Sequence, residues 1–295
     1  MNHFAAFTKR NVKLFLRDKP TVFFSFLSAM VLIALYFLFI AKTYSTAMQE
    51  HAGDFLSLSA SNFMIYLQMM AGVLVLNSMS LTTGAFGIIA HDFENRRVDS
   101  FLLTPLRTGE MLASYYAASI IVSFTLNVFT WLASSVLIGA LTGYWITAAT
   151  FFAGIGILVI TSFISASLML LITTLVKSSA AIGVISGIAG TFFGFLCGIY
   201  MPYSNFGEGT IKIGSTLPFT HLTIWLKQTV LADAFSQVGI TGEMKDIFLK
   251  DFFSAGGVGF VGMDVPLWLM IVLCSVFALV CLTIARLLLK RRLSV

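Results

Sequence analysis

The chain has 295 residues, of which 58% are hydrophobic and 11% are charged, with a formal net charge of +5 and a mean hydropathy of +0.94. Soluble domains carry roughly 25% charged residues, so this composition excludes an ordinary soluble protein and predicts a function in or across a bilayer. Between Glu110 and Glu208 there is no acidic residue, and Lys177 is the only charged one. We therefore expect the lipid bilayer, and no nucleic acid, among the partners of this chain.

Residues 1–20 predict a helix that lies in the membrane interface. At 100° per residue, Lys9, Arg10, Lys13 and Arg17 fall on one face, and apolar side chains spread over the opposite face. A basic flank that only satisfies the positive-inside rule is the alternative. Pro20 suits the first turn of the next helix, so residues 21–295 are expected to form the transmembrane domain.

Six apolar runs then follow, and each is long enough to cross a bilayer. About 20 residues, rising roughly 1.5 Å each, span a hydrocarbon core of about 30 Å. Each run must be a helix, because backbone N–H and C=O groups cannot stay unpaired in lipid. The sequence therefore predicts an all-α membrane protein with six transmembrane helices. The runs are residues 21–41, 63–90, 111–141, 146–176, 180–200 and 265–289.

The lysines and arginines predict the orientation of these helices in the membrane. We assign 13 of the 18 bases to the cytoplasmic side, together with both termini, in a prokaryotic cell (plasma) membrane. The other side then holds Lys42, Lys212, Lys227, Lys245 and Lys250. The first run is too long for a signal peptide, so we expect it to be retained. Cys197, Cys274 and Cys281 lie within apolar runs, where disulfide or metal chemistry is not expected.

A charged segment, residues 91–110, separates the second and third runs, and the helix expected at about 91–105 should end before Pro105. Its mixed charges suit a protein surface better than anionic lipid, which would favour bases alone. We therefore predict a short helix that docks onto a protein, with an ordinary cytoplasmic loop as the alternative. The expected docking residues are Asp92, Phe93, Glu94, Arg96, Arg97, Asp99, Phe101 and Leu102.

Two helical stripes predict contact faces. The fifth run carries glycines at steps of three and four, which should line one face and allow another helix to approach closely. Packing within one subunit and packing at a subunit interface beside a transport path are both open. These glycines are Gly183, Gly187, Gly190, Gly194 and Gly198.

The second run carries an uncharged, mildly polar stripe at the same helical spacing. A plain interhelical hydrogen bond and a contact with cargo are both open for its amide. The stripe consists of Tyr66, Met70, Val73, Asn77, Ser80 and Gly84.

Residues 201–264 form the longest polar segment and hold 6 of the 13 acidic residues. Their pattern predicts an amphipathic helix at 221–234, a charged helix at 242–252 and a flexible glycine-rich break at 256–259. The segment lacks metal-ligand spacing, so its ionisable residues are expected to form a solvated face. These residues are His221, Glu243, Lys245, Asp246, Lys250 and Asp251.

The whole pattern resembles the membrane subunits of ABC-2 type transporters. The resemblance rests on the basic start, the six runs, Glu94…Asp99…Leu102-Leu103-Thr104-Pro105…Glu110, and Leu217-Pro218-Phe219-Thr220. It implies that residues 91–105 are a coupling helix that docks into a groove of the ATP-binding subunit, and that residues 201–264 carry re-entrant helices as an outer lid. It also implies that the second and fifth spans face a partner permease. The implied partners are two copies of an ABC ATP-binding subunit and a second copy of this permease or a homologous one.

No enzymatic site is expected in the chain itself. A phosphate-binding loop needs a Gly-Lys pair, and no lysine here follows a glycine. We therefore expect no cofactor or metal in this chain, with ATP and Mg on the partner subunit. The spans also lack the filter of a channel and the catalytic groups of an intramembrane hydrolase, and the lack of a buried carboxylate makes an ion-coupled secondary transporter the weaker alternative. An uncharged path suits export of an amphiphilic drug, peptide or lipid, and a non-transporting scaffold, sensor or self-protection subunit is the strongest alternative.

Overall fold

The computed structural model describes residues 3–35, 38, 42, 44–46, 48, 56–102, 108–176, 178–200, 206–256 and 267–293. Every regular element of these residues is a helix, so the all-α prediction is confirmed for them. The helices are α1 His3–Arg17, α2 Lys19–Leu35, α4 Leu58–Glu94, α5 Arg97–Leu102, α6 Thr108–Thr142, α7 Ala148–Leu175, α8 Ser179–Leu196, α9 Glu208–Ser215, α10 Pro218–Val238, α11 Gly242–Ile247, the π-helical turn η4 Phe248–Phe252, and α12 Leu267–Leu293.

Among the described residues, four helices are long and apolar enough to cross a membrane: α4, α6, α7 and α12. They coincide with the second, third, fourth and sixth predicted runs. The fifth run forms α8, which ends at Leu196 rather than at residue 200. The first run forms α2, which is described to Leu35; residues 36, 37 and 39–41 of that run lie outside the described residues. Six spans therefore remain a prediction, and four of them have a helix of suitable length and composition among the described residues.

Local sequence signals account for several helix ends. The hydroxyl of Ser57 accepts a hydrogen bond from the backbone N–H of Ala60 at 3.2 Å, and so caps the first turn of α4. Thr147 caps α7 in the same way. At the other end of a helix, Gly239 has a φ of 80° and terminates α10 in the left-handed conformation that glycine adopts without strain. The predicted break at Pro20 is also present, because α1 ends at Arg17 and α2 begins at Lys19.

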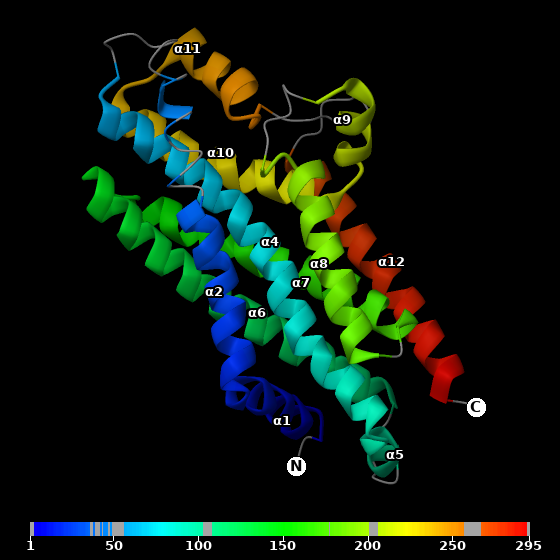
Figure 1. Cartoon of the computed structure of the whole chain (residues 1–295). Coiled ribbons are helices and arrows are strands. Elements are labelled where there is room, and N and C mark those ends of the chain that lie inside the picture. The colour runs from blue at the N-terminus through cyan, green and yellow to red at the C-terminus, as the bar shows by residue number, and fades with distance from the viewer. Residues whose placement is uncertain are drawn as a thin grey trace.

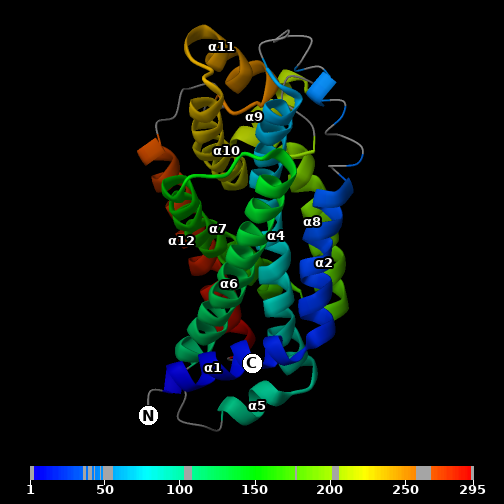
Figure 2. The same ribbon diagram turned by 90° about the vertical axis from the view of Figure 1, so that its left-hand side faces the viewer.

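The long helices form a bundle with two distinct ends (Figures 1 and 2). Helix α1 crosses one end of the bundle, where α5 and the last residues of α12 also lie. Helices α9 and α11 lie at the opposite end. We call these the α5 end and the α11 end. This arrangement puts α1, the last residues of α12 and the charged segment of residues 91–102 at the same end of the bundle.

Helix α4 is the centre of the bundle. It contacts α1, α2, α6, α7, α8 and α10. In its most apolar stretch of 18 residues 78% is buried, compared with 22% in the corresponding stretch of α12. Helices α6 and α7 join through Trp131, whose indole donates a hydrogen bond to the carbonyl of Phe151 at 3.2 Å. Gly154 makes room for this indole, since a Cβ atom there would lie 2.8 Å from it. Side-chain size therefore fixes how these helices meet.

Helix α10 differs from the sequence expectation. Residues 221–234 are helical, as predicted, but α10 is buried against α4, α7 and α12 instead of presenting a broad polar face to solvent. His221 and Lys227 belong to its buried residues. The amphipathic assignment is therefore wrong, because hydrogen bonds to backbone carbonyls allow these two polar side chains to be buried. The predicted charged helix at 242–252 is present as α11 and η4.

Candidate functional site

A buried carboxylate joins three helices at the α5 end. Asp92, near the end of α4, is 0% exposed and accepts hydrogen bonds from Arg10 of α1 at 2.7 and 3.1 Å. The hydroxyl of Tyr115 on α6 donates to the same carboxylate at 2.6 Å. Arg97, the first residue of α5, lies 3.7 Å from it. We call Arg10, Asp92, Arg97 and Tyr115 the Asp92 cluster, and it ties the start of the chain to the segment between α4 and α6.

Aromatic rings surround the guanidinium of this cluster. The Arg10 guanidinium carbon lies 4.8 Å from the ring centroid of Phe101 on α5 and 5.2 Å from that of Phe7 on α1. Phe7 in turn meets the edge of Phe101 at 5.0 Å and of Tyr115 at 5.2 Å between centroids. These cation–π and edge-to-face contacts are favourable in addition to the apolar area they bury. Helix α5 is therefore held against α1 by packing as well as by charge.

The eight predicted docking residues fall into distinct environments. Residues 91–94 belong to the end of α4, and a turn at Asn95 and Arg96 separates them from α5, so one continuous docking helix is not observed. Glu94, Arg96 and Arg97 are exposed, and Phe93 is partly buried. Asp92 and Phe101 contact other helices of this chain. The side chains of Asp99 and Leu102, and residues 103–105, lie outside the described residues.

Asp92 is thus not placed to contact a partner directly, whereas docking through Phe101, which is partly buried against Phe7, stays a prediction. Asp92 has no exposed surface, because Arg10, which lies 82 residues earlier, covers its carboxylate. No local pattern could identify that partner. The available signal was an acidic residue in a segment that also holds arginines. A carboxylate that becomes buried there needs a partner, since an isolated carboxylate is too costly to bury.

A polar seam joins α4, α6 and α7 in the middle of the bundle. The amide of Asn77 donates to the Asn127 carbonyl oxygen on α6 at 2.9 Å. Asn127 donates in turn to the Leu74 carbonyl at 3.1 Å and to the Ser78 hydroxyl. The hydroxyl of Ser123 bonds to the Ser78 carbonyl at 3.3 Å. The interhelical hydrogen bond that was open for Asn77 is therefore present, and Asn127 is a central residue that the sequence analysis did not single out.

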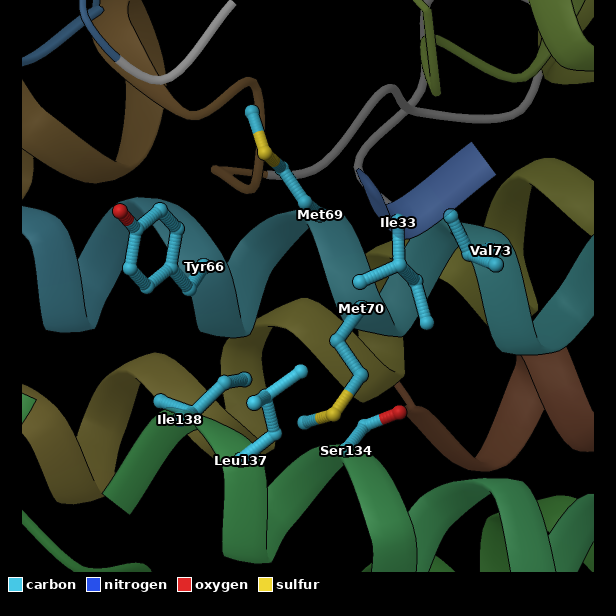
Figure 3. A pocket seen from close by; sticks show the side chains of 8 residues that line it. All are labelled: Ile33, Tyr66, Met69, Met70, Val73, Ser134, Leu137 and Ile138. Carbon is cyan, nitrogen blue, oxygen red and sulfur yellow. The ribbon is translucent and has the colours of Figure 1, made fainter. Parts of the chain in front are cut away.

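The rest of the α4 stripe does not form one continuous open face in a single chain. Tyr66, Met70 and Val73 line a small apolar pocket between α2, α4 and α6, with the Met70 side chain pointing toward Ser134 and Leu137 (Figure 3). This pocket admits only about one water molecule, so in this conformation it is a packing gap rather than a cargo-sized cavity. Ser80 is exposed and Gly84 is partly exposed.

The predicted glycine stripe of α8 falls into an open part and a part that is packed within the chain. A Cβ atom at Gly183, Gly187 or Gly190 would meet no described atom within 4 Å, whereas one at Gly194 would collide with the Tyr200 ring. Gly198 lies beyond the end of α8 with a φ of 63°, so the prediction that all five glycines share one helix face is wrong there.

The open part of α8 is an apolar surface. Val184, Ile188 and Phe192 are exposed beside Gly183 and Gly187. Among the described residues, packing within one subunit therefore accounts for Gly194 alone. Val184 and Ile188 therefore share the exposed surface of Gly183 and Gly187.

Two buried polar groups hold the α11 end together. Lys227 of α10 is 3% exposed and donates to the carbonyls of Gly198 at 3.1 Å and Phe253 at 3.2 Å. Burial lowers the pKa of Lys227 to about 8. The imidazole of His221 bonds to the Ser215 carbonyl at 2.8 Å, and burial lowers its pKa. The solvated-face prediction is wrong for His221, whereas Glu243, Asp246 and Lys250 are exposed as expected and Lys245 is partly exposed.

A comparison with known protein families finds one match that covers most of the chain. The model of the ABC-2 type transporter family matches residues 2–231, a range that runs from α1 into α10 and includes the Asp92 cluster and the polar seam. No curated protein matches the chain. Together with the four long apolar helices, the family match identifies a multi-pass membrane protein.

Proposed function

Since the chain belongs to the ABC-2 type transporter family, and is therefore a permease component of an ABC transporter, we propose that it works with a separate ABC ATP-binding subunit present in two copies. ATP and Mg would bind to that partner. The family match over residues 2–231 is the observation that carries this proposal. The absence of a Gly-Lys phosphate-binding loop from the sequence supports it.

The proposed docking surface for the ATP-binding subunit is the α5 end. Glu94, Arg96 and Arg97 are exposed there with charges of both signs, which favours a protein partner. Beneath them, the Asp92 cluster fastens α5 to α1 and α6. A force applied by the partner at α5 would therefore be passed to three helices of the bundle. Under this proposal the α5 end is cytoplasmic, and the protein lies in a prokaryotic cell membrane.

The proposed cargo is an amphiphilic drug, peptide or lipid that leaves the cell. The exposed face of α8 is apolar, with Thr191 as a polar group. A neutral, mainly apolar surface suits an amphiphile and offers poor solvation to a small ion.

A second permease, identical or homologous, is proposed to cover this face of α8. Exposed glycines beside apolar side chains allow close helix packing in lipid, where small residues let two backbones approach. The outer lid is proposed to comprise α9, α10 and α11, which Lys227 ties to the end of α8.

An ATPase measurement tests the proposal that the partner subunit, and not this chain, hydrolyses ATP. The chain should be reconstituted into liposomes alone and with the ABC ATP-binding subunit that co-purifies with it in mild detergent. We expect no hydrolysis above background from the chain alone and cargo-stimulated hydrolysis from the complex. Robust hydrolysis by the chain after every partner has been removed would overturn the proposal. A complex that hydrolyses ATP but never moves cargo would favour the scaffold or sensor role instead.

A further inference from the structure

Helix α1 carries a row of three bases that the Asp92 cluster does not use. Lys9, Lys13 and Arg17 are spaced four residues apart, so they lie one above the other on the helix surface, and all three are exposed. Arg10, which the sequence analysis placed on the same face, turns toward Asp92 instead. The four bases thus divide into one that anchors the helix to the bundle and three that point away from it.

Nothing in the described residues neutralises this row. Helix α1 contains no acidic residue, and no described side chain forms an ion pair with Lys9, Lys13 or Arg17. The nearest acid in the sequence is Asp18, and its carboxylate accepts hydrogen bonds from the backbone N–H of Thr21 at 3.2 Å and from the Thr21 hydroxyl at 2.6 Å. The row therefore offers three positive charges to a partner outside the chain.

Large exposed apolar side chains follow the Arg17 end of the row in the sequence. Leu16 is 52% exposed at the end of α1, and Phe23 and Phe24, in the first turns of α2, are 61% and 63% exposed. Helix α1 lies across the end of the bundle, whereas α2 runs along it (Figure 2). A basic row thus meets an apolar surface where a horizontal helix turns into a vertical one. This is the geometry of a helix at the boundary between lipid headgroups and acyl chains.

We propose that Lys9, Lys13 and Arg17 form a binding surface for anionic phospholipids of the leaflet at the α5 end. The ammonium and guanidinium groups would bind the headgroup phosphates, and the acyl chains would lie along Phe23 and Phe24. A lipid with net negative charge is selected, because a zwitterionic headgroup offers the same phosphate but cancels its charge. An acidic protein surface would complement the bases but would leave the two exposed phenylalanines without an apolar partner.

A consequence follows that rests on the proposed function. The same helix is fastened to α5 through the ion pair of Arg10 with Asp92 and the ring contact of Phe7 with Phe101. Lipid bound to the row would hold α1, and α1 would hold α5 in the position in which the ATP-binding subunit meets it. Anionic lipid should therefore raise the ATPase activity of the complex without taking part in the reaction.

The proposed lipid-binding surface is tested first on the full chain without the ATP-binding subunit. The chain is reconstituted in phosphatidylcholine bilayers, and the selectivity for spin-labelled phosphatidylglycerol over spin-labelled phosphatidylcholine is measured by electron spin resonance. The test variant is Lys9→Gln/Lys13→Gln/Arg17→Gln. The matched control, Lys212→Gln/Lys245→Gln/Lys250→Gln, removes the same charge at the α11 end. Each base near a membrane surface contributes about fivefold to anionic-lipid binding, so the test variant should lose at least about fivefold in selectivity.

Two results would overturn the lipid surface. One is equal selectivity in the wild-type chain and the test variant, and the other is an equal loss in both variants, which would reflect net charge alone. The wild-type chain also provides a test without mutation, because raising the salt from 0.1 to 1 M should reduce the selectivity. Selectivity that is insensitive to salt would contradict the charge-based surface.

A measurement of ATPase activity in the complex then distinguishes failure of the proposed lipid-binding surface from failure of the proposed function. In the complex, replacing phosphatidylcholine with a mixture containing phosphatidylglycerol should stimulate hydrolysis in the wild type and the control, and not in the test variant. If the test variant instead loses its ATPase partner while keeping its lipid selectivity, the row is a protein contact and the lipid surface is refuted. If no ATPase partner exists, the proposed function fails while the spin-label result stands.

Discussion

From the geometry of the Asp92 cluster, we expect mutation of Arg10 to destabilise the protein more than mutation of Asp92. Arg10→Met keeps much of the length of the side chain and removes the guanidinium. It leaves the buried carboxylate of Asp92 with the Tyr115 hydroxyl at 2.6 Å and a distant Arg97 at 3.7 Å. An ionised carboxylate without its main cation is then confined among apolar groups. Asp92→Asn leaves Arg10 unpaired, but that side chain is 27% exposed and can reach water.

The expected loss of stability in each variant depends on how much water can reach the charged group that has lost its partner. Removing one partner of a buried ion pair costs about 3–5 kcal/mol, and the remaining Tyr115 bond and the partial exposure of Arg10 reduce this to about 2–3 kcal/mol for Arg10→Met. Asp92→Asn should cost about 1 kcal/mol, since the amide oxygen still accepts from Tyr115. The double variant has no buried charge, so it should be about 1–2 kcal/mol more stable than Arg10→Met alone.

The assay is a double-mutant cycle on the purified chain in detergent, with the free energy of unfolding taken from denaturant titrations followed by tryptophan fluorescence. Arg97→Met is the matched control, because its guanidinium is 52% exposed and a surface pair of this kind is worth about 0–1 kcal/mol. A double variant that loses the sum of the two single losses would refute the reasoning. It would mean that Arg10 and Asp92 stabilise the fold independently.

Three further predictions concern the rest of the bundle. The stability of the wild type should rise between pH 8 and 10.5, because over that range Lys227 is neutral when folded and still charged when unfolded. The gain should be up to about 3 kcal/mol, and a Lys227→Met variant whose stability rises equally would exclude this group as the cause. Asn127→Ala should cost about 1–2 kcal/mol, because the variant loses the seam, whereas Ser80→Ala at an exposed site should leave stability unchanged; equal effects would contradict the seam. Gly194→Leu should impair folding of the single chain, whereas Gly187→Leu should reduce only assembly in a native gel, since its side chain has free space; a folding defect in Gly187→Leu would show intrachain packing there.

Composition and periodicity predicted the parts of this fold that depend on the bilayer. The runs at 63–90, 111–141, 146–176 and 265–289 became helices because lipid requires every backbone group to be bonded within the segment. The amphipathic helix of residues 3–17 and the break at Pro20 follow from local rules as well. Helix ends were less accurate, because α4 extends to Glu94 and carries the first docking residues with it.

Contacts between distant residues could not be predicted in the same way. Arg10 and Lys9 are adjacent and equally basic, and only the fold decides that Arg10 faces Asp92 and Lys9 faces outward. Lys227 looked like one more external charge, since its partners are the backbone carbonyls of Gly198 and Phe253, which every residue possesses. A sequence pattern identifies the residues that need partners, whereas tertiary structure identifies the partners.

Docking of an ABC ATP-binding subunit at the α5 end can be detected by site-directed cross-linking. Ser100→Cys places an exposed thiol on α5, and Gln237→Cys places one near the end of α10, while the native Cys197, Cys274 and Cys281 are buried. Each variant would be treated in membranes with a thiol-to-amine cross-linker after co-expression with the ATP-binding subunit. We expect this subunit to be captured by Ser100→Cys and not by Gln237→Cys. Capture from Gln237→Cys alone, or equal capture from both positions, would contradict it.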